Sequence, residues 1–147
     1  MCKHQAPLPP ALMATRRWQH ARSFPGRADQ IRRARGFLAA LLDGHPAAAD
    51  AVLLASELAA NAVAHSASGQ PGGTFTLRAC LDDGCVHVEV EDQGGSAWDG
   101  DLSAAEPPHG LYLLRALSTA CGARRGEHGW VTWFSIAAPA AWQASQP

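Results

Sequence analysis

The chain has 147 residues, of which 47% are hydrophobic and 17% charged, and its formal net charge is −1. This length and composition suit one globular domain with a single core, and no stretch approaches the roughly 18 to 20 apolar residues that a membrane span requires. The N-terminus has no apolar stretch before its prolines and so does not resemble a secretory signal, which leads us to expect a cytoplasmic protein.

The first third of the chain is basic. Residues 1–14 are rich in proline and alanine without periodicity, which predicts a flexible N-terminal arm, and residues 16–24 predict an edge strand. Residues 1–35 contain eight Lys or Arg residues but a single acidic one, Asp29. Such a stretch fits nucleic acid or an acidic partner, but a solvated basic face is more common. Neither a helix-turn-helix pattern nor stacking aromatics accompany it, so we do not expect nucleic-acid binding.

Two helices are predicted next. Asp29 is expected to cap the first helix, whose apolar residues recur every three or four positions until Gly44. The second helix runs from Asp50 to His65 and is apolar around most of its circumference. We therefore expect it to be buried, with its polar side chains needing partners or a cavity.

A hairpin follows, with residues 74–81 and 85–92 alternating as two antiparallel strands. A two-residue turn between them places Cys80 opposite His87 rather than opposite Cys85, which argues against a bridge between the two cysteines. The four cysteines of the chain are too few and too scattered for a disulfide scaffold, so we expect reduced thiols. No paired ligand spacing predicts a metal held by protein side chains alone.

The last third begins with residues 93–108, which are rich in glycine and proline and predict a long loop of the kind that often binds ligands. A helix over 110–117 and a hairpin over 121–125 and 130–136 complete the domain. We place the domain at 15–138 and a C-terminal tail at 139–147. The pattern predicts an α+β fold, in which a mixed, mostly antiparallel sheet is covered on one face by three helices.

Three polar side chains share one stripe of the second helix. Glu57, Asn61 and His65 are spaced by four residues, which places them on the same face. A carboxylate can accept a hydroxyl proton, and an asparagine carbonyl can bind Mg²⁺ beside phosphate oxygens. Taken alone, the same stripe fits a solvent-facing edge with Asn61 hydrogen-bonded to the backbone.

Glycines mark both ends of the predicted loop. Asp92 ends a strand and precedes Gly94, where glycine permits a tight turn and the close approach of a ligand, although this pattern is also an ordinary turn signal. Gly110 and Leu111 open the third helix, whose free N–H groups can receive a phosphate, as those of any helix start can.

In combination these motifs resemble the sequence boxes of the histidine-kinase-like (GHKL) ATPases, particularly the bacterial anti-sigma-factor serine/threonine kinases. The N box, G1 box and G2 box of that family are matched by Glu57-Leu-Ala-Ala-Asn61-Ala-Val-Ala-His65, Asp92-Gln-Gly94-Gly95 and His109-Gly110-Leu111. The resemblance extends over residues 18–136 and implies a two-layer α/β sandwich, the Bergerat fold.

The resemblance also implies a role for each matched residue. Asp92 would accept the adenine amino group, Asn61 would coordinate Mg²⁺ among the ATP phosphates, and Glu57 would be the general base. The implied ATP-binding set is Asn61, His65, Asp92, Gly94, Gly110 and Leu111. Gly94 would let the base approach.

Two positions depart from the family pattern. Pro108 stands in place of the first glycine of the G2 box, and proline lacks the N–H that a phosphate loop uses. Relatives often have a threonine near the base in the last hairpin. Alignment puts Val131 there, with Thr132 pointing to the other face of the strand.

The resemblance implies a cytoplasmic regulator that binds ATP and Mg²⁺, phosphorylates an antagonist protein on serine or threonine, and sequesters a transcription factor. The partners would be a sigma factor and an anti-anti-sigma antagonist. The alternative is a non-catalytic protein-binding module with weak or no ATP binding, and a DNA-associated protein is a third. A homodimer stays open, because relatives in this branch often act as dimers.

Overall fold

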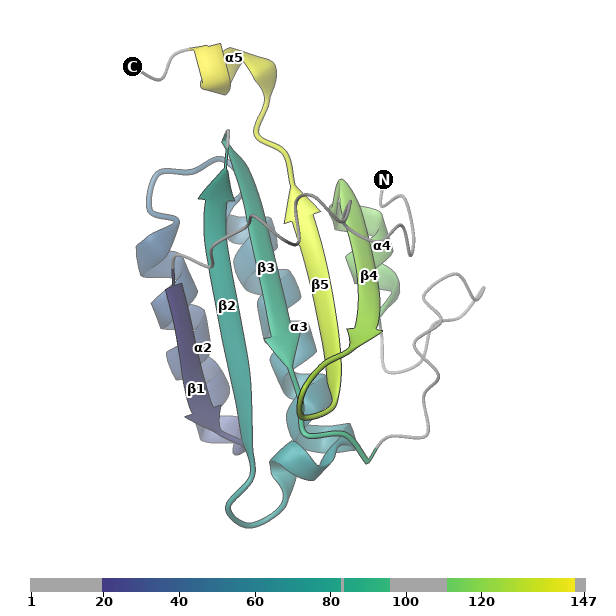
Figure 1. Ribbon diagram of the computed structural model, residues 1–147. Helices are drawn as coiled ribbons and strands as arrows, with labels where there is room; N and C mark the ends of the chain where they lie inside the picture. Colours follow the sequence, from purple (N-terminus) through teal and green to yellow (C-terminus); the bar gives the residue numbers. More distant parts are fainter. Residues whose placement is uncertain (1–19, 83, 96–110, 145–147) are drawn as a thin grey trace.

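A computed structural model describes residues 20–82, 84–95 and 111–144 (Figure 1). The elements are β1 (His20–Pro25), α2 (Ala28–Leu41), α3 (Ala48–His65), the 3₁₀ turn η1 (Ala67–Gly69), β2 (Thr74–Asp82), β3 (Cys85–Glu91), α4 (Tyr112–Leu117), β4 (Ala120–Arg125), β5 (Trp130–Ile136) and α5 (Ala140–Ala144). The predicted N-terminal arm and most of the predicted loop lie outside the described residues.

The strands form one five-stranded sheet in the order β1-β2-β3-β5-β4. Helices α2, α3 and α4 all lie on one face of it, as Figure 1 shows. This arrangement confirms the predicted two-layer α+β fold. Every strand pair in the described part of the chain is antiparallel, so the sheet is not mixed there.

Strand alternation gives the sheet one apolar face and one polar face. Val86, Val88 and Val90 face the helices and are buried, as the period of two predicts. Apolar side chains of the helices pack against this face. In the same core the rings of Phe24 on β1 and Phe75 on β2 stack, with centroids 5.4 Å apart. The intervening strand residues point to the other face, away from the helices.

The start of α2 differs from the prediction. Arg27, in an extended conformation, occupies the N-cap position and makes no side-chain cap hydrogen bond. Asp29 lies inside the first turn, where its carboxylate accepts a hydrogen bond from Arg27 Nε at 3.0 Å. The expectation that Asp29 caps the helix is therefore wrong, because the N-cap lies two residues earlier. The carboxylate still sits near the positive end of the helix dipole, where an anion is stabilising.

The predicted C-terminal tail contains the short helix α5, which is too brief to show a periodic pattern. Its Trp142 packs on the ring of His45, with centroids 4.5 Å apart. His45 is itself buried, and both of its ring nitrogens have partners. Nδ1 accepts a hydrogen bond from the Ala47 N–H, and Nε2 donates one to the Gly84 carbonyl oxygen at 2.8 Å. The contact joins the end of the chain to the helix layer and to the β2–β3 turn.

The cysteines follow the predicted register in the hairpin. Cys80 pairs with His87 and Cys85 with Asp82, so the two cysteines are not bridged to each other. Cys121, in contrast, is disulfide-bonded, and the expectation of reduced thiols is wrong at that residue.

Replacing Gly36 with alanine should stabilise the protein. Gly36 lies within α2 on the solvent side, and an added Cβ there would meet nothing within 4 Å. Because glycine in a helix interior is about 1 kcal/mol less favourable than alanine, we expect the free energy of unfolding to rise by roughly that amount. Urea denaturation measures the change, and a loss of stability would contradict the exposed helical position.

Candidate functional site

The polar stripe of α3 lies between the buried and the exposed faces of the helix. Glu57 and Asn61 are half-buried, and His65, the last residue of α3, is exposed. Asn61 has an unusual environment, because its amide Nδ2 is buried yet has no hydrogen-bond partner within the described part of the chain. A buried amide without a partner costs about 1–3 kcal/mol, so it points to a place that a ligand completes.

The turn after β3 holds Asp92 rigidly. Asp92 Oδ1 accepts backbone hydrogen bonds from Gly94 at 2.7 Å and from Trp130 at 3.1 Å, while the Asp92 N–H donates to the Trp130 carbonyl. Among the described residues, no donor addresses Oδ2. Gly94 has φ +75°, a conformation that favours glycine. The carboxylate is therefore fixed in place, with one oxygen left for a ligand.

The β4–β5 turn packs directly behind Asp92. A Cβ at Gly129 would lie 2.3 Å from the Gly94 nitrogen and 2.7 Å from Asp92 Oδ1. Any side chain at Gly129 would thus displace the turn that carries the carboxylate. Sequence reasoning missed this residue, because a glycine in a hairpin turn usually reports only on the turn itself.

The fold brings the C-terminal end of α3 and the Asp92 turn together. The Ala67 N–H, two residues beyond the end of α3, donates to the Gly94 carbonyl oxygen at 2.7 Å. The residues that directly follow α3 are therefore tied to the turn that follows β3. Gly110 lies outside the described residues, as do Pro108 and His109.

Leu111 and the last hairpin show two further outcomes. Leu111 directly precedes α4 and is buried in the hydrophobic core. On β5, Thr132 pairs with Val90 and so faces the helices, whereas Val131 pairs with Glu91 and faces the other way. The two side chains do point to opposite faces, but the threonine is the one on the side of α3. The structure therefore places Thr132, and not Val131, on the face of the sheet that the helices cover.

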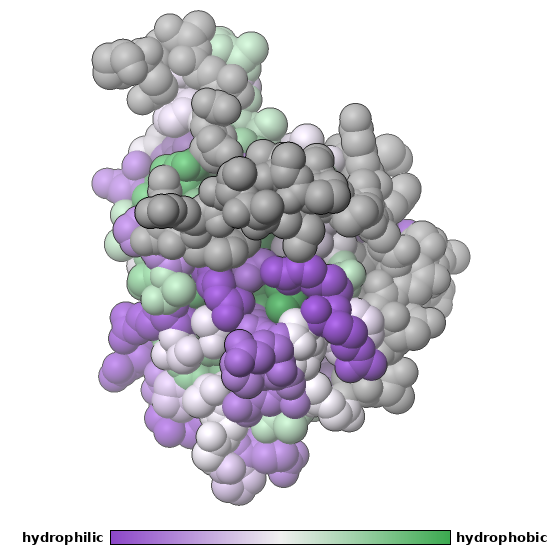
Figure 2. Space-filling model, in the orientation of Figure 1, coloured by the Kyte–Doolittle hydropathy of each residue, from purple (hydrophilic) through white to green (hydrophobic). Residues whose placement is uncertain are grey.

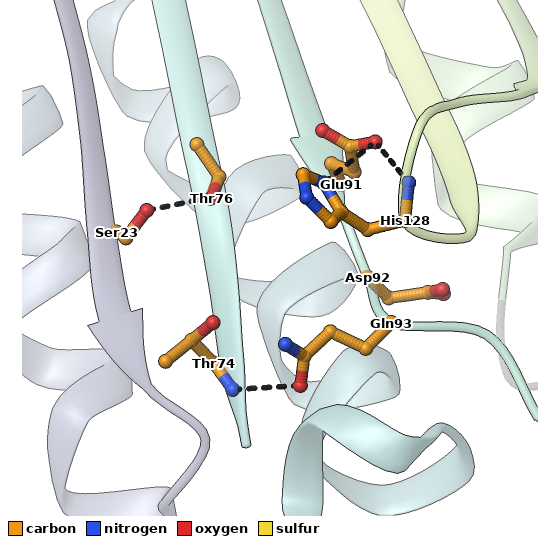
Figure 3. Close-up of a pocket in the computed structure, with 7 residues that line it drawn as sticks. All are labelled: Ser23, Thr74, Thr76, Glu91, Asp92, Gln93 and His128. Carbon is orange, nitrogen blue, oxygen red and sulfur yellow. Dashed lines mark hydrogen bonds and ion pairs between the residues drawn. The ribbon is translucent and has the colours of Figure 1, made fainter. Parts of the chain in front are cut away.

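The face of the sheet away from the helices is polar, and Figure 2 shows hydrophilic side chains gathered on it. A cavity of about 180 Å³ opens there (Figure 3) and is lined by Ser23, Thr74, Thr76, Glu91, Asp92, Gln93 and His128. None of the lining residues comes from α3. Asp92 therefore lines this cavity, whereas Glu57 and Asn61 do not.

Ion pairs on the polar face brace the end of β3. Arg78 contacts Glu89 at 2.9 Å and Glu91 at 2.8 Å, and Arg124 contacts Glu89 at 3.0 Å. Burial raises the pKa of Glu89 despite its two arginines. Burial also acts to raise the pKa of Glu91, but hydrogen bonds from Arg78 and the His128 N–H outweigh it and lower that pKa. The residue before Asp92 is thereby tied to β2 and to the β4–β5 turn.

The described residues include no group of three or more His, Cys, Asp or Glu side chains placed to hold a metal ion. A magnesium ion carried by nucleotide phosphates needs fewer protein ligands, and the amide oxygen of Asn61 suits that chemistry, while its Nδ2 can donate to a phosphate oxygen. Within the same residues, no helix has the length and apolarity to cross a membrane.

Comparison with known proteins agrees with this geometry. The model of the histidine kinase-like ATPase domain family matches residues 24–136. The crystal structure of the RsbU and RsbW domains of Rv1364c from Mycobacterium tuberculosis aligns with a TM-score of 0.59 and 22% identity, over 82% of this chain and 33% of that one. The match thus spans about a third of that solved chain, and the likeness concerns the fold. A search of curated proteins found no match. The chain belongs to the histidine kinase-like ATPase domain family.

Proposed function

We propose that this domain binds ATP with Mg²⁺ and acts in the cytoplasm as a serine/threonine kinase of the anti-sigma-factor type. It would phosphorylate an antagonist protein and sequester a sigma factor when that antagonist is unavailable for binding. The observation that carries the proposal is the buried amide nitrogen Nδ2 of Asn61, which has no partner among the described residues and lies one helical turn from the half-buried Glu57. Membership of the ATPase family supports the nucleotide.

The residues of the site divide the work between the two ends of the nucleotide. Asp92 offers Oδ2 to the adenine amino group, while its Oδ1 is held by backbone N–H groups. Gly94, without a side chain, leaves room for the base. Thr132 faces the same side of the sheet and can add a hydroxyl contact. At the other end, His65, Gly110 and Leu111 belong to the segments proposed to border the phosphates.

Transfer requires a base near the acceptor. Bound Mg²⁺, oriented by Asn61, would neutralise charge on the phosphates. Glu57 takes the proton from the acceptor hydroxyl. As that proton leaves, the oxygen of the hydroxyl forms a bond to the γ-phosphorus. The bond from that phosphorus to the bridging oxygen breaks, and ADP leaves with the electron pair. The role of this chain is therefore to position the groups and to accept one proton.

The test is a calorimetric titration with ATP, with and without Mg²⁺, on the wild type and on Asn61→Ala. Since hydrogen bonds to charged groups contribute about 1.5–3 kcal/mol, we expect roughly 10- to 100-fold weaker binding of the variant in Mg²⁺. In EDTA the difference should shrink, because only the hydrogen bond that Nδ2 can donate to the nucleotide then distinguishes the two proteins. The thermal stability without nucleotide should not fall, because the removed Nδ2 has no hydrogen-bond partner in the described part of the chain.

Gln70→Ala is the matched control, since it removes an exposed amide after η1. It should bind ATP as the wild type does. Equal Mg²⁺ dependence of wild type and Asn61→Ala would contradict the metal role. If the wild type shows neither heat nor a thermal shift at millimolar ATP, the non-catalytic protein-binding module is the better account of the chain.

A further inference from the structure

The turn η1 ties itself back to α3 at the level of the proposed metal residue. Ser66 Oγ donates to the Ala62 carbonyl oxygen at 2.6 Å, and the Ser68 N–H donates to Ser66 Oγ at 3.1 Å. Ala62 directly follows Asn61 in the chain. The position of Ser68 is thus set by the same helical turn that presents the Asn61 amide.

The same turn reaches forward to the adenine end. Ser68 Oγ accepts the N–H of Gln93 at 3.0 Å, and the neighbouring Ala67 N–H donates to the Gly94 carbonyl at 2.7 Å. These two bonds hold the residues that directly follow Asp92. A continuous path of hydrogen bonds therefore runs from the carbonyl of Ala62 to the turn that carries the proposed adenine acceptor.

Close packing prevents η1 from adjusting. Ser68 is 0% exposed. A Cβ at Gly26 would lie 1.6 Å from the Ser68 carbonyl oxygen, and one at Gly73 would lie 2.2 Å from the same atom. The backbone at Gly26 and the backbone at Gly73 thus both pack closely against the carbonyl of Ser68. Because the turn is confined, loss of the hydroxyl cannot be compensated by a shift of η1 toward Gln93.

We infer that Ser68 is a positioning residue that sets the Asp92 turn relative to Asn61 and so makes adenine recognition depend on α3; this rests on the proposed nucleotide site. The hydroxyl contacts no nucleotide itself. Without it, the Gln93 N–H loses this acceptor, and the turn that follows Asp92 keeps the Ala67–Gly94 bond and the bond from the Thr74 N–H to Gln93 Oε1. Adenine presents an amino donor to a carboxylate, whereas guanine presents a carbonyl oxygen at the same position. An Asp92 carboxylate that is held less firmly therefore discriminates less between adenine and guanine.

The test compares Ser68→Ala with the wild type in titrations of ATP·Mg²⁺ and GTP·Mg²⁺. An unsatisfied buried donor costs about 1–3 kcal/mol, so we expect ATP binding to weaken roughly 5- to 100-fold. GTP binding should change less, so that the ATP-to-GTP affinity ratio falls. A purely destabilising change would leave that ratio as it is. An unchanged ratio in a folded Ser68→Ala protein overturns the inference.

Ser56→Ala is the matched control, because Ser56 Oγ bonds the Val52 carbonyl within α3 and does not reach the Asp92 turn. It should keep the wild-type ratio. If Ser68→Ala does not fold, Ser66→Ala takes its place, since it cuts the same path one bond earlier. The same fall in the ratio is expected, and an unchanged ratio again overturns the inference.

Hydrogen exchange separates this inference from the proposed function. In nucleotide-free protein, the amides of Gln93 and Gly94 should exchange faster in Ser68→Ala than in the wild type and Ser56→Ala. If the wild type binds no ATP, the proposed function fails. Faster exchange would then still support the positioning of the Asp92 turn, and unchanged exchange would overturn it.

Discussion

Glu57→Gln should abolish most phosphoryl transfer while leaving ATP binding nearly intact. A positioned general base contributes roughly 10²- to 10⁴-fold to a rate, and glutamine keeps the shape of glutamate without its proton affinity. Glu57 is half-buried on the α3 stripe, one helical turn before Asn61. The transfer of label from ATP to candidate antagonist proteins measures the rate, and calorimetry measures the binding.

The control for Glu57→Gln is Asp50→Asn, which neutralises an exposed carboxylate in the first turn of the same helix. It should transfer label at a rate close to that of the wild type. Equal rates for Glu57→Gln and the wild type would exclude Glu57 as the base. A wild type that binds ATP but labels no antagonist would remove the kinase part of the proposal and leave an ATP-binding regulator.

Gly129→Ala should damage both the fold and the site. The new methyl group would stand 2.3 Å from the Gly94 nitrogen and 2.6 Å from the Asp92 carbonyl oxygen, so backbone must move. Overpacking of this kind costs about 1–3 kcal/mol. Because the same movement displaces the Asp92 carboxylate, we expect ATP binding to weaken at least roughly tenfold in protein that remains folded.

Gly36→Ala is the matched control, since the same substitution at an open helical position should raise stability. Opposite signs in urea denaturation would show that close approach at Gly129, and not glycine itself, sets the effect. Similar stabilities for wild type and Gly129→Ala, with unchanged ATP affinity, would show that the turn can move away from Asp92 without consequence.

The contrast between Thr132 and Ser68 shows where prediction from the sequence reached its limit. Alternation predicted that Thr132 and Val131 point to opposite faces of the strand. It could not say which face the helices cover at that point, and the pairing of Thr132 with Val90 supplied the answer. The sequence did not indicate the role of Ser68. A serine after a helix usually marks only the end of that helix, and the partner of Ser68, Gln93, is 25 residues away.

By itself the sequence determined the local features of this protein: the α3 stripe of Glu57, Asn61 and His65, the β2–β3 register, and the turn formed by Asp92 and Gly94. Periodicity and turn chemistry act over a few residues, so these features are legible in the chain. Only the tertiary structure decided that the Asp92 turn is held between η1 and Gly129, and that Thr132 faces α3. Those relations depend on which segments pack against each other, and close packing between distant segments leaves no periodic trace in the sequence.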